Sequence, residues 1–359
     1  MFIAMMGIRD HAIAFGIALL GSLFLTLPVR RLALRLGLVD QPGPRKVHLR
    51  PIPLLGGLAI YLGFVLATVL TLRGQSQRQI SGILAGATLV AAVGFLDDGK
   101  LLHHQLKLFV GMPIAGAFLL ASGIRAQIFS GFVPGLAGNV LDCCFTLFWV
   151  VGITAAFSIL DHLDGLCAGV AAVAAAFFAI SAAWNGQVMV CTLAAAAFGA
   201  ALGFLWWNFN PAKIFMGDGG AMFLGFLMAV LGLKIRPLGA SFLMNWVVPI
   251  LILGVPIFDT TMVSISRARR GLLPFASPGK DHTAHRLSNL GLGHRGAVLA
   301  LYLLGALFGC SALLVSRLPL PLAYGFAGAV VLCGVIAICL LESAPYERQG
   351  NVQKPAGPA

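Results

Sequence analysis

Five aspartates along the chain are of a type and spacing that could do phosphate or metal chemistry. They are Asp97 and Asp98 in GFLDDG, Asp161 and Asp164 in FSILDHLDGL, and Asp218 in IFMGDGG. Each motif lies at the edge of a long apolar run, where a carboxylate is costly to hold unless it has a use. Carboxylate oxygens, together with substrate phosphates, are the ligands that Mg²⁺ prefers. The pattern therefore predicts a divalent-cation or acid–base site at a membrane surface.

The adjacent pair Asp97 and Asp98 predicts a division of labour. Consecutive residues on a helix point about 100° apart, so the two carboxylates cannot serve one atom in the same way. One is expected to approach a metal or a proton while the other holds the loop. A helix end without a function is the alternative interpretation, and the neighbouring His103, His104 and Lys107 favour the functional one.

Ser158, Asp161 and Asp164 follow one another at intervals of three residues. If the stretch is helical, the three side chains share one face, where they could hold a cation or bind the hydroxyls and amides of a ligand. The alternative interpretation is a loop, because Asp-Gly and His favour turns.

The segment NFNPAKIFMGDGG places Asp218 and two glycines at the start of an apolar stretch. A helix that begins here could leave backbone N–H groups open to a phosphate, with Asp218 as an oxygen ligand of Mg²⁺. Lys213 adds one cation. A plain turn between two helices is the alternative.

Two basic loops complete the set of candidates. RKVHLR carries Lys46 and His48, and DHTAHRL carries His282, His285 and Arg286. Both could be ordinary loops attracted to anionic lipid, but no topology rule requires the histidines. The H-x-x-H spacing can also suggest zinc, for which no partner ligands occur at matching spacing.

Long apolar segments must position these residues. The chain has 359 residues, of which 59% are hydrophobic and 10% charged, whereas soluble domains carry about 25% charged residues. This composition excludes an ordinary soluble enzyme and a disordered chain. Eleven windows could form spanning helices of about 20 residues: 11–29, 53–72, 80–96, 107–124, 139–157, 166–184, 188–207, 220–235, 243–263, 296–316 and 321–341. We expect an all-α polytopic membrane bundle, with one domain over 1–342 and a disordered tail over 343–359.

Charge predicts the sidedness of this bundle. Most of the 24 lysines and arginines lie in the loops that follow the odd-numbered windows, so the positive-inside rule puts those loops in the cytoplasm. The N-terminus is then outside and the C-terminus inside, and the candidate aspartates and histidines lie at the cytoplasmic face. A net charge of +12 could attract nucleic acid, anionic lipid or an anionic substrate, but without a soluble basic domain we expect no nucleic acid.

The seven cysteines lie in or beside apolar runs and are interpreted as small core residues.

The motifs in this order resemble one family. The resemblance runs from about residue 37 to 295 and is to the polyprenyl-phosphate N-acetylhexosamine-1-phosphate transferases, the superfamily of the bacterial GlcNAc-1-phosphate and phospho-MurNAc-pentapeptide transferases. The motifs that carry it are RKVHLRPIPLLGG, GFLDDG, FSILDHLDGL, NFNPAKIFMGDGG and DHTAHRL. The resemblance implies transfer of a sugar-1-phosphate, GlcNAc-1-phosphate by default, from a UDP-N-acetylhexosamine to polyprenyl (undecaprenyl) phosphate with release of UMP. It implies Mg²⁺, with Mn²⁺ as an alternative, and an active site on the cytoplasmic face of the bacterial inner membrane. The product would initiate a lipid-linked cell-envelope glycan, and a homodimer is left open.

The resemblance also implies residue roles. Catalytic residues would be Asp97, Asp98, Asp161 and Asp164; metal ligands Asp218 and Ser158; and substrate-binding residues Lys46, His48, Lys107, Ser158, Lys213, His282, His285 and Arg286.

The chain departs from the family pattern at several of these motifs. The family usually has Asn at the positions of Ala155 and Ser158, Gly at that of His162, and a further histidine at that of Ala284. A third Asp, common in the GlcNAc-type branch, is replaced by Leu101. These differences favour the second hypothesis, a non-catalytic relative that binds lipid phosphate or nucleotide sugar. An unrelated transporter is a third hypothesis, and it would place ionisable groups near mid-membrane.

Overall fold

The computed structural model describes residues 2–42, 51–99, 101–102, 106–236, 244–272, 279 and 281–344, almost all of them in helices. The elements are α1 (Phe2–Arg35), β1 (Val39–Asp40), β2 (Ile52–Pro53), α2 (Gly56–Thr71), α3 (Gln77–Asp98), the π-helical turn η1 (Lys107–Gly111), α5 (Met112–Ala121), the 3₁₀ turn η2 (Phe129–Gly131), α6 (Leu136–Leu160), α7 (Leu166–Trp184), α8 (Val188–Asn208), α9 (Gly217–Lys234), α10 (Met244–Ile252), α11 (Gly254–Arg269), α12 (Thr283–Leu287), η3 (Ser288–Leu292), α13 (Gly293–Val315) and α14 (Leu320–Glu342). The two short strands pair antiparallel, with Val39 opposite Pro53. The expected tail over 343–359 falls outside the described residues except for Ser343 and Ala344.

The helices confirm a polytopic membrane protein. Among the described residues, 8 helices are long and apolar enough to cross a membrane, or 9 if one bent pair forms a single span. The predicted windows 53–72 and 107–124 correspond to shorter apolar helices, Gly56–Thr71 and Lys107–Ala121. The count of eleven therefore stays a prediction, as does the orientation of the termini.

The window 243–263 is not one straight helix. It divides into α10 and α11, which are bent by 76° at the break. Pro256 has no N–H to donate to the carbonyl of Ile252 one turn earlier, so the helical hydrogen-bond ladder is interrupted there. The predicted straight helix is corrected to a bent pair of helices.

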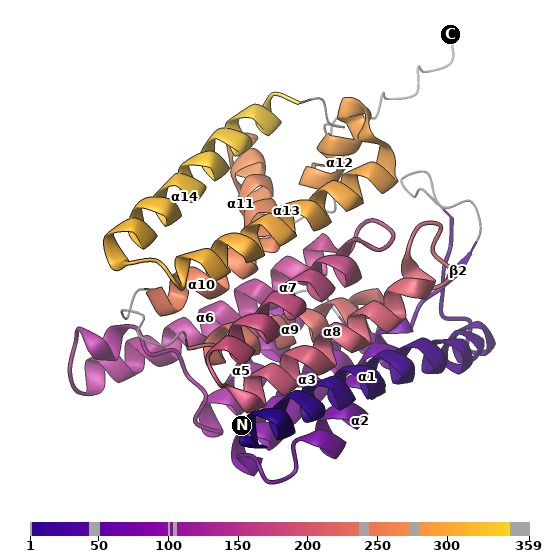
Figure 1. Ribbon diagram of the computed structural model, residues 1–359. Helices are drawn as coiled ribbons and strands as arrows, with labels where there is room; N and C mark the ends of the chain where they lie inside the picture. The colour runs from indigo at the N-terminus through magenta and orange to yellow at the C-terminus, as the bar shows by residue number, and fades with distance from the viewer. Residues whose placement is uncertain are drawn as a thin grey trace.

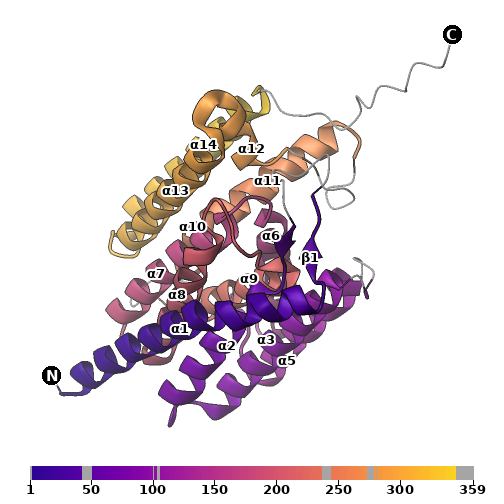
Figure 2. The same cartoon turned by 90° about the vertical axis from the view of Figure 1, so that its right-hand side faces the viewer.

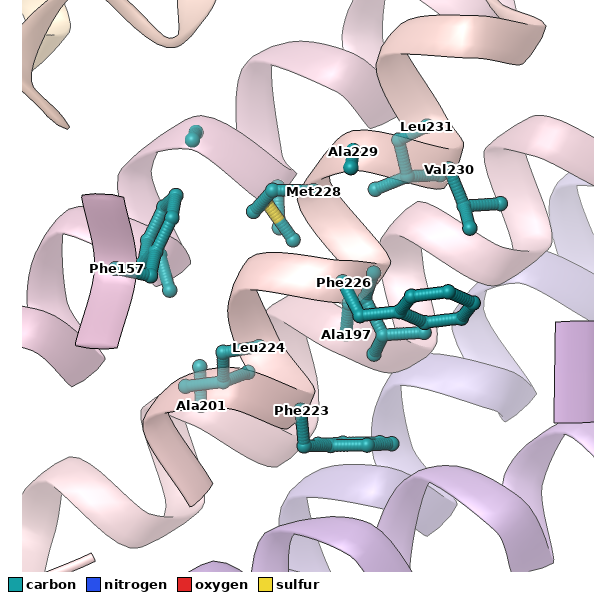
Figure 3. Close-up of a cluster of buried hydrophobic side chains, with 14 of the residues drawn as sticks. Phe157, Ala197, Ala201, Phe223, Leu224, Phe226, Met228, Ala229, Val230 and Leu231 are labelled. Atoms are coloured by element: carbon teal, nitrogen blue, oxygen red, sulfur yellow. The ribbon is translucent and has the colours of Figure 1, made fainter. Parts of the chain in front are cut away.

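Helix α9 forms the centre of the bundle, and nearly all of its residues are buried. Phe223, Leu224 and Phe226 of α9 lie among side chains of neighbouring helices, including Ala197 of α8 and Phe157 of α6 (Figure 3). A membrane helix that is apolar all round is expected at such a position, because it meets protein rather than lipid on every side.

The remaining helices surround this centre, and the site motifs gather at one end. The start of α1 lies at the opposite end from the β1–β2 ribbon and α12 (Figures 1 and 2). Helices α13 and α14 run side by side along one flank in both views. Only Ala323 of α14 is buried, so this helix turns most of its apolar surface outward.

Candidate active site

The end of α3 is joined to the start of α9 by Asp98. One carboxylate oxygen of Asp98 accepts the backbone N–H of Asp218 at 2.8 Å, and the other accepts that of Gly219 at 3.1 Å. The first N–H groups of a helix have no partner within the helix, so Asp98 acts as a cap supplied by a neighbouring helix. Gly217 has a φ of 70°, and a Cβ there would lie 2.4 Å from Asp98 Oδ2. The expectation that these N–H groups are open to phosphate is therefore corrected.

Lys107 joins two further carboxylates. Its ammonium lies 2.7 Å from Oδ2 of Asp97 and 2.5 Å from Oδ2 of Asp218. Ser158 donates from its hydroxyl to the other oxygen of Asp218 at 2.8 Å. Four predicted residues thus meet, each from a different element: α3, η1, α6 and α9. We call Asp97, Lys107, Ser158 and Asp218 the carboxylate–lysine cluster.

Asp161 and Asp164 lie in a turn and not on a helix face, contrary to the helical hypothesis. Helix α6 ends at Leu160, where Asp161 leaves the helical conformation with ψ at 61°, and Gly165 then takes a φ of 77°. Burial, together with the negative charges of Asp218, Asp98 and Asp164, raises the pKa of Asp161 well above its usual range. Asp161 therefore belongs to the same electrostatic site although it does not share a helix with Asp164.

Asparagines that sequence reasoning missed hold this turn. Asp164 accepts from the side chain of Asn210 and from the backbone N–H of Ala212, both at 3.0 Å. Asn208 accepts the backbone N–H of Gly165 at 3.1 Å. Both asparagines belong to the NFNP motif. Their amide side chains are the sequence feature from which this role could have been predicted.

The histidines form a second group next to this turn. His282 contacts the carboxylate of Asp259 through Nδ1 at 2.9 Å, and the backbone N–H of Thr283 donates to the other oxygen at 2.7 Å. His162 stacks on His282 with ring centroids 4.3 Å apart and lies 4.7 Å from the ring of His285. The structure thus brings the predicted His282 and His285 together. Sequence reasoning assigned no role to Asp259 or His162.

Arg286 was expected to bind phosphate or sugar, but it is fully buried within the protein. Its guanidinium donates to the backbone carbonyl of Asp281 at 3.0 Å, to that of Leu341 at 2.7 Å and to the hydroxyl of Ser266 at 2.9 Å. It also lies 3.2 Å from Glu342. In this structure Arg286 therefore ties α12 to α11 and α14 instead of facing a ligand.

The other basic candidates lie apart from the cluster or outside the described residues. The ammonium of Lys213 lies over the ring of Trp207, 5.3 Å from its centroid, and Lys213 is exposed. Lys46 and His48 lie outside the described residues, as do His103 and His104. The structure therefore gives no ligand-facing role to Lys213.

The oxygen atoms of the site are ligands that suit a hard cation bound together with a substrate. Within the described ranges, no three His, Cys, Asp or Glu side chains are arranged to hold a metal ion by themselves. Mg²⁺, however, commonly takes only one or two carboxylates and completes its shell with water and substrate phosphates. Among the described residues, Asp97 and Asp218 share the ammonium of Lys107, and the charges of Asp218 and Asp98 also act on Asp161. Carboxylates gathered in this way disfavour one another's ionisation, and a divalent cation would offset that repulsion.

Sequence comparisons agree with the motifs. The profile of Glycosyl transferase family 4 matches residues 80–236. A relative from Bacillus subtilis (strain 168), named a probable undecaprenyl-phosphate N-acetylglucosaminyl 1-phosphate transferase, is 39% identical over 307 residues, which cover 84% of each chain. The decaprenyl-phosphate N-acetylglucosaminephosphotransferase of Mycobacterium tuberculosis (strain CDC 1551 / Oshkosh) is 32% identical over 96% of this chain and 91% of its own.

A more distant relative gives the same result. The undecaprenyl-phosphate alpha-N-acetylglucosaminyl 1-phosphate transferase of Escherichia coli (strain K12) is 28% identical and covers 81% of this chain and 80% of its own. The residues that the family profile matches include the four members of the carboxylate–lysine cluster. The chain belongs to the polyprenyl-phosphate N-acetylhexosamine-1-phosphate transferase family and is a membrane glycosyl-1-phosphate transferase.

Proposed function

We propose that the protein transfers N-acetylglucosamine-1-phosphate from UDP-N-acetylglucosamine to undecaprenyl phosphate or a similar polyprenyl phosphate and releases UMP. The names of the relatives support the acceptor and the sugar. The observation that carries the proposal is the ammonium of Lys107, held between the carboxylates of Asp97 and Asp218. Two anionic substrates can approach one another only where positive charge offsets their own, and the ammonium of Lys107 supplies one such charge at the site.

In this reaction an oxygen of the lipid phosphate attacks the sugar-linked phosphorus of the donor, and the bond to the UMP oxygen breaks. Phosphoryl transfer requires mainly positioning and neutralisation of charge. The second pKa of a phosphate monoester is about 6, so the acceptor is largely dianionic at neutral pH and needs no strong base. Lys107 neutralises one phosphate, while Asp97 orients the lipid phosphate and accepts any proton that it still carries.

Asp218 and Ser158 would hold Mg²⁺, with Mn²⁺ as an alternative, and the ion would supply further neutralisation of the phosphates. Asp98 fixes the first turn of α9 and so fixes the position of Asp218. Asp161 and Asp164 lie in the adjoining turn, and we assign that turn to the nucleotide-sugar side of the site. We assign the whole site to the cytoplasmic face of the bacterial inner membrane, where a soluble nucleotide sugar and an embedded lipid phosphate can meet.

The test is UMP release by the purified protein in liposomes containing undecaprenyl phosphate, with Mg²⁺ and a panel of UDP-sugars. We expect UMP only when lipid phosphate is present, with UDP-N-acetylglucosamine as the best donor, and we expect chelation of the metal to stop release. Asp218→Asn and Lys107→Met should abolish activity. Lys234→Met is the matched lysine control, because Lys234 bonds to Gln79 and not to a carboxylate of the site.

The binding-only alternative gives a different result in the same assay. Ala155 offers no donor or acceptor, and the hydroxyl of Ser158 already bonds to Asp218. If the folded protein binds UDP-N-acetylglucosamine but releases no UMP with any donor or metal, the chain is a non-catalytic relative and the proposed reaction is wrong.

A further inference from the structure

Three imidazole rings meet beside the turn that carries Asp161. His162 lies in this turn between α6 and α7, His282 immediately precedes α12, and His285 lies within α12. The rings of His162 and His282 are stacked at 4.3 Å, and that of His285 lies 4.7 Å from His162. Segments far apart in the sequence thus place their histidines around a common point.

The surroundings of His162 determine which of its nitrogens carries hydrogen. Nδ1 lies 3.2 Å from the backbone carbonyl oxygen of Ile159. Because a carbonyl can only accept, Nδ1 is the donor. Burial and the neighbouring His282 lower the pKa of His162 well below its usual range, so the ring is neutral at neutral pH. Nε2 then presents a lone pair.

The environment of Nε2 differs from that of Nδ1. Nε2 of His162 is shielded from solvent and makes no hydrogen bond within the described part of the chain. By contrast, Nδ1 of the adjacent His282 has the carboxylate of Asp259 as its partner. Buried polar atoms are nearly always satisfied, and an acceptor left open beside a substrate site is a position for a ligand.

We propose that His162 binds the donor substrate, with its Nε2 accepting a hydrogen bond from an N–H or O–H group of the nucleotide sugar. The assignment rests on the proposed function and adds to it a residue that determines donor affinity. His162 directly follows Asp161 in the turn between α6 and α7. This is the turn that we assigned above to the nucleotide-sugar side of the site.

The two rings packed against His162 belong to a short segment that His282 and Arg286 anchor to α11. They lie on or immediately before α12, a helix of 5 residues. It joins α13 through η3, in which Gly291 has a φ of 105°, and through Gly293 with a φ of 64°. Nε2 opens to the donor when this short helix shifts, and that movement requires the contacts of His282 and Arg286 with α11 to rearrange.

The experiment compares two substitutions that separate the ring nitrogens. His162→Asn keeps an amide near Nδ1 but has no atom near Nε2, whereas His162→Gln can place its amide oxygen near Nε2. We expect His162→Asn to raise the KM for UDP-N-acetylglucosamine about 5- to 10-fold, with the KM for undecaprenyl phosphate unchanged. His162→Gln should recover part of the loss. His11→Asn is the matched control, because His11 also uses Nδ1, toward Thr192 on α8.

Calorimetric titration with UDP and with UDP-N-acetylglucosamine identifies the group that His162 binds. Weaker binding of both ligands to His162→Asn indicates the nucleoside, and weaker binding of the sugar nucleotide alone indicates the sugar; either supports the assignment. A folded His162→Asn variant with wild-type donor KM and Kd would overturn it. A wild-type protein that neither binds nor turns over a nucleotide sugar would instead contradict the proposed function, and this assignment with it.

Discussion

The two neighbouring aspartates of α3 make different contacts, which separates their roles. Asp98 uses both oxygens to accept backbone N–H groups at the start of α9. Asp97 uses one oxygen to bind Lys107. Because consecutive helical residues point about 100° apart, each carboxylate reaches a different neighbour. Asp98 positions α9, whereas Asp97 holds the ammonium that we assign to phosphate binding in the proposed reaction.

Asp97→Asn and Asp98→Asn should therefore have different effects. The amide of Asp98→Asn turns an NH₂ group toward one backbone N–H, so one hydrogen bond is lost and the free energy of unfolding falls by about 1–3 kcal/mol. Asp97→Asn should lower the transfer rate roughly 10²-fold with a smaller loss of stability. Thermal unfolding in detergent and the transfer rate check both. Equal destabilisation by the two variants would show that the roles are not separate.

Several site residues were predictable from the sequence because they lie at the ends of apolar runs. This applies to Asp97, Lys107 and Asp218, which the structure joins. The roles of Asp259 and His162 were not predictable, because their partners lie in distant segments and no local pattern marks such a contact. The helical spacing of Ser158, Asp161 and Asp164 was misleading because the helix ends at Leu160.

At the scale of the helices, the site depends on close approach between backbones. A Cβ at Gly57 of α2 would lie 2.3 Å from the Cα and the backbone nitrogen of Gly220 in α9, and one at Gly94 of α3 would lie 2.5 Å from the Cα of Gly219. Small residues let membrane helices pack this closely. Helices α2 and α3 thereby hold the first turn of α9, which carries Asp218.

Gly57→Ala should disturb this contact and with it the site. The added methyl group meets backbone, which cannot turn aside, so we expect a loss of about 1–3 kcal/mol of unfolding free energy and a lower transfer rate. Gly152→Ala in α6 is the control, because a Cβ there would have no atom within 4 Å and alanine is the better helix former. Melting temperatures of the two variants check the prediction. A stable, active Gly57→Ala protein would contradict the close-packing argument.

The contact between α11 and the segment before α12 depends on pH. Although burial alone would raise the pKa of Asp281, hydrogen bonds from Arg267 and Arg270 lower it to about 2, against about 3.9 when unfolded. This stabilisation is present above about pH 4 and is lost as the pH falls toward 2. Asp281→Asn should therefore destabilise the protein most at neutral pH. A difference from wild type that stays constant down to about pH 3 would contradict this.

Hydropathy was sufficient to locate the helices but not their shape. Every predicted window falls on an apolar helix, because burial in lipid requires continuous apolar sequence. Hydropathy did not predict the bend between α10 and α11. A mean over a window of residues carries no information about the missing N–H of Pro256. The short helices α2 and α5 likewise show that a window of apolar residues overestimates helix length.

For the whole molecule, the distribution of lysine and arginine predicts that the site end faces the cytoplasm. In a variant without its native cysteines, Arg73→Cys in the loop between α2 and α3 should react with an impermeant thiol reagent applied outside intact cells. His294→Cys at the start of α13 should react only after the cells are opened. Both native side chains are exposed. The reverse labelling pattern would place the site outside the cytoplasm.

In the proposed reaction, sugar and phosphate move together from the nucleotide to the lipid. The most direct measurement supplies UDP-N-acetylglucosamine labelled with ³²P in the sugar-linked phosphate to the protein in liposomes containing undecaprenyl phosphate. We predict that the label passes into the lipid phase, that unlabelled UMP stays in the aqueous phase, and that Asp218→Asn transfers none. Label that remains in aqueous UDP while sugar enters the lipid would mean transfer of the sugar alone, and would contradict the proposed reaction.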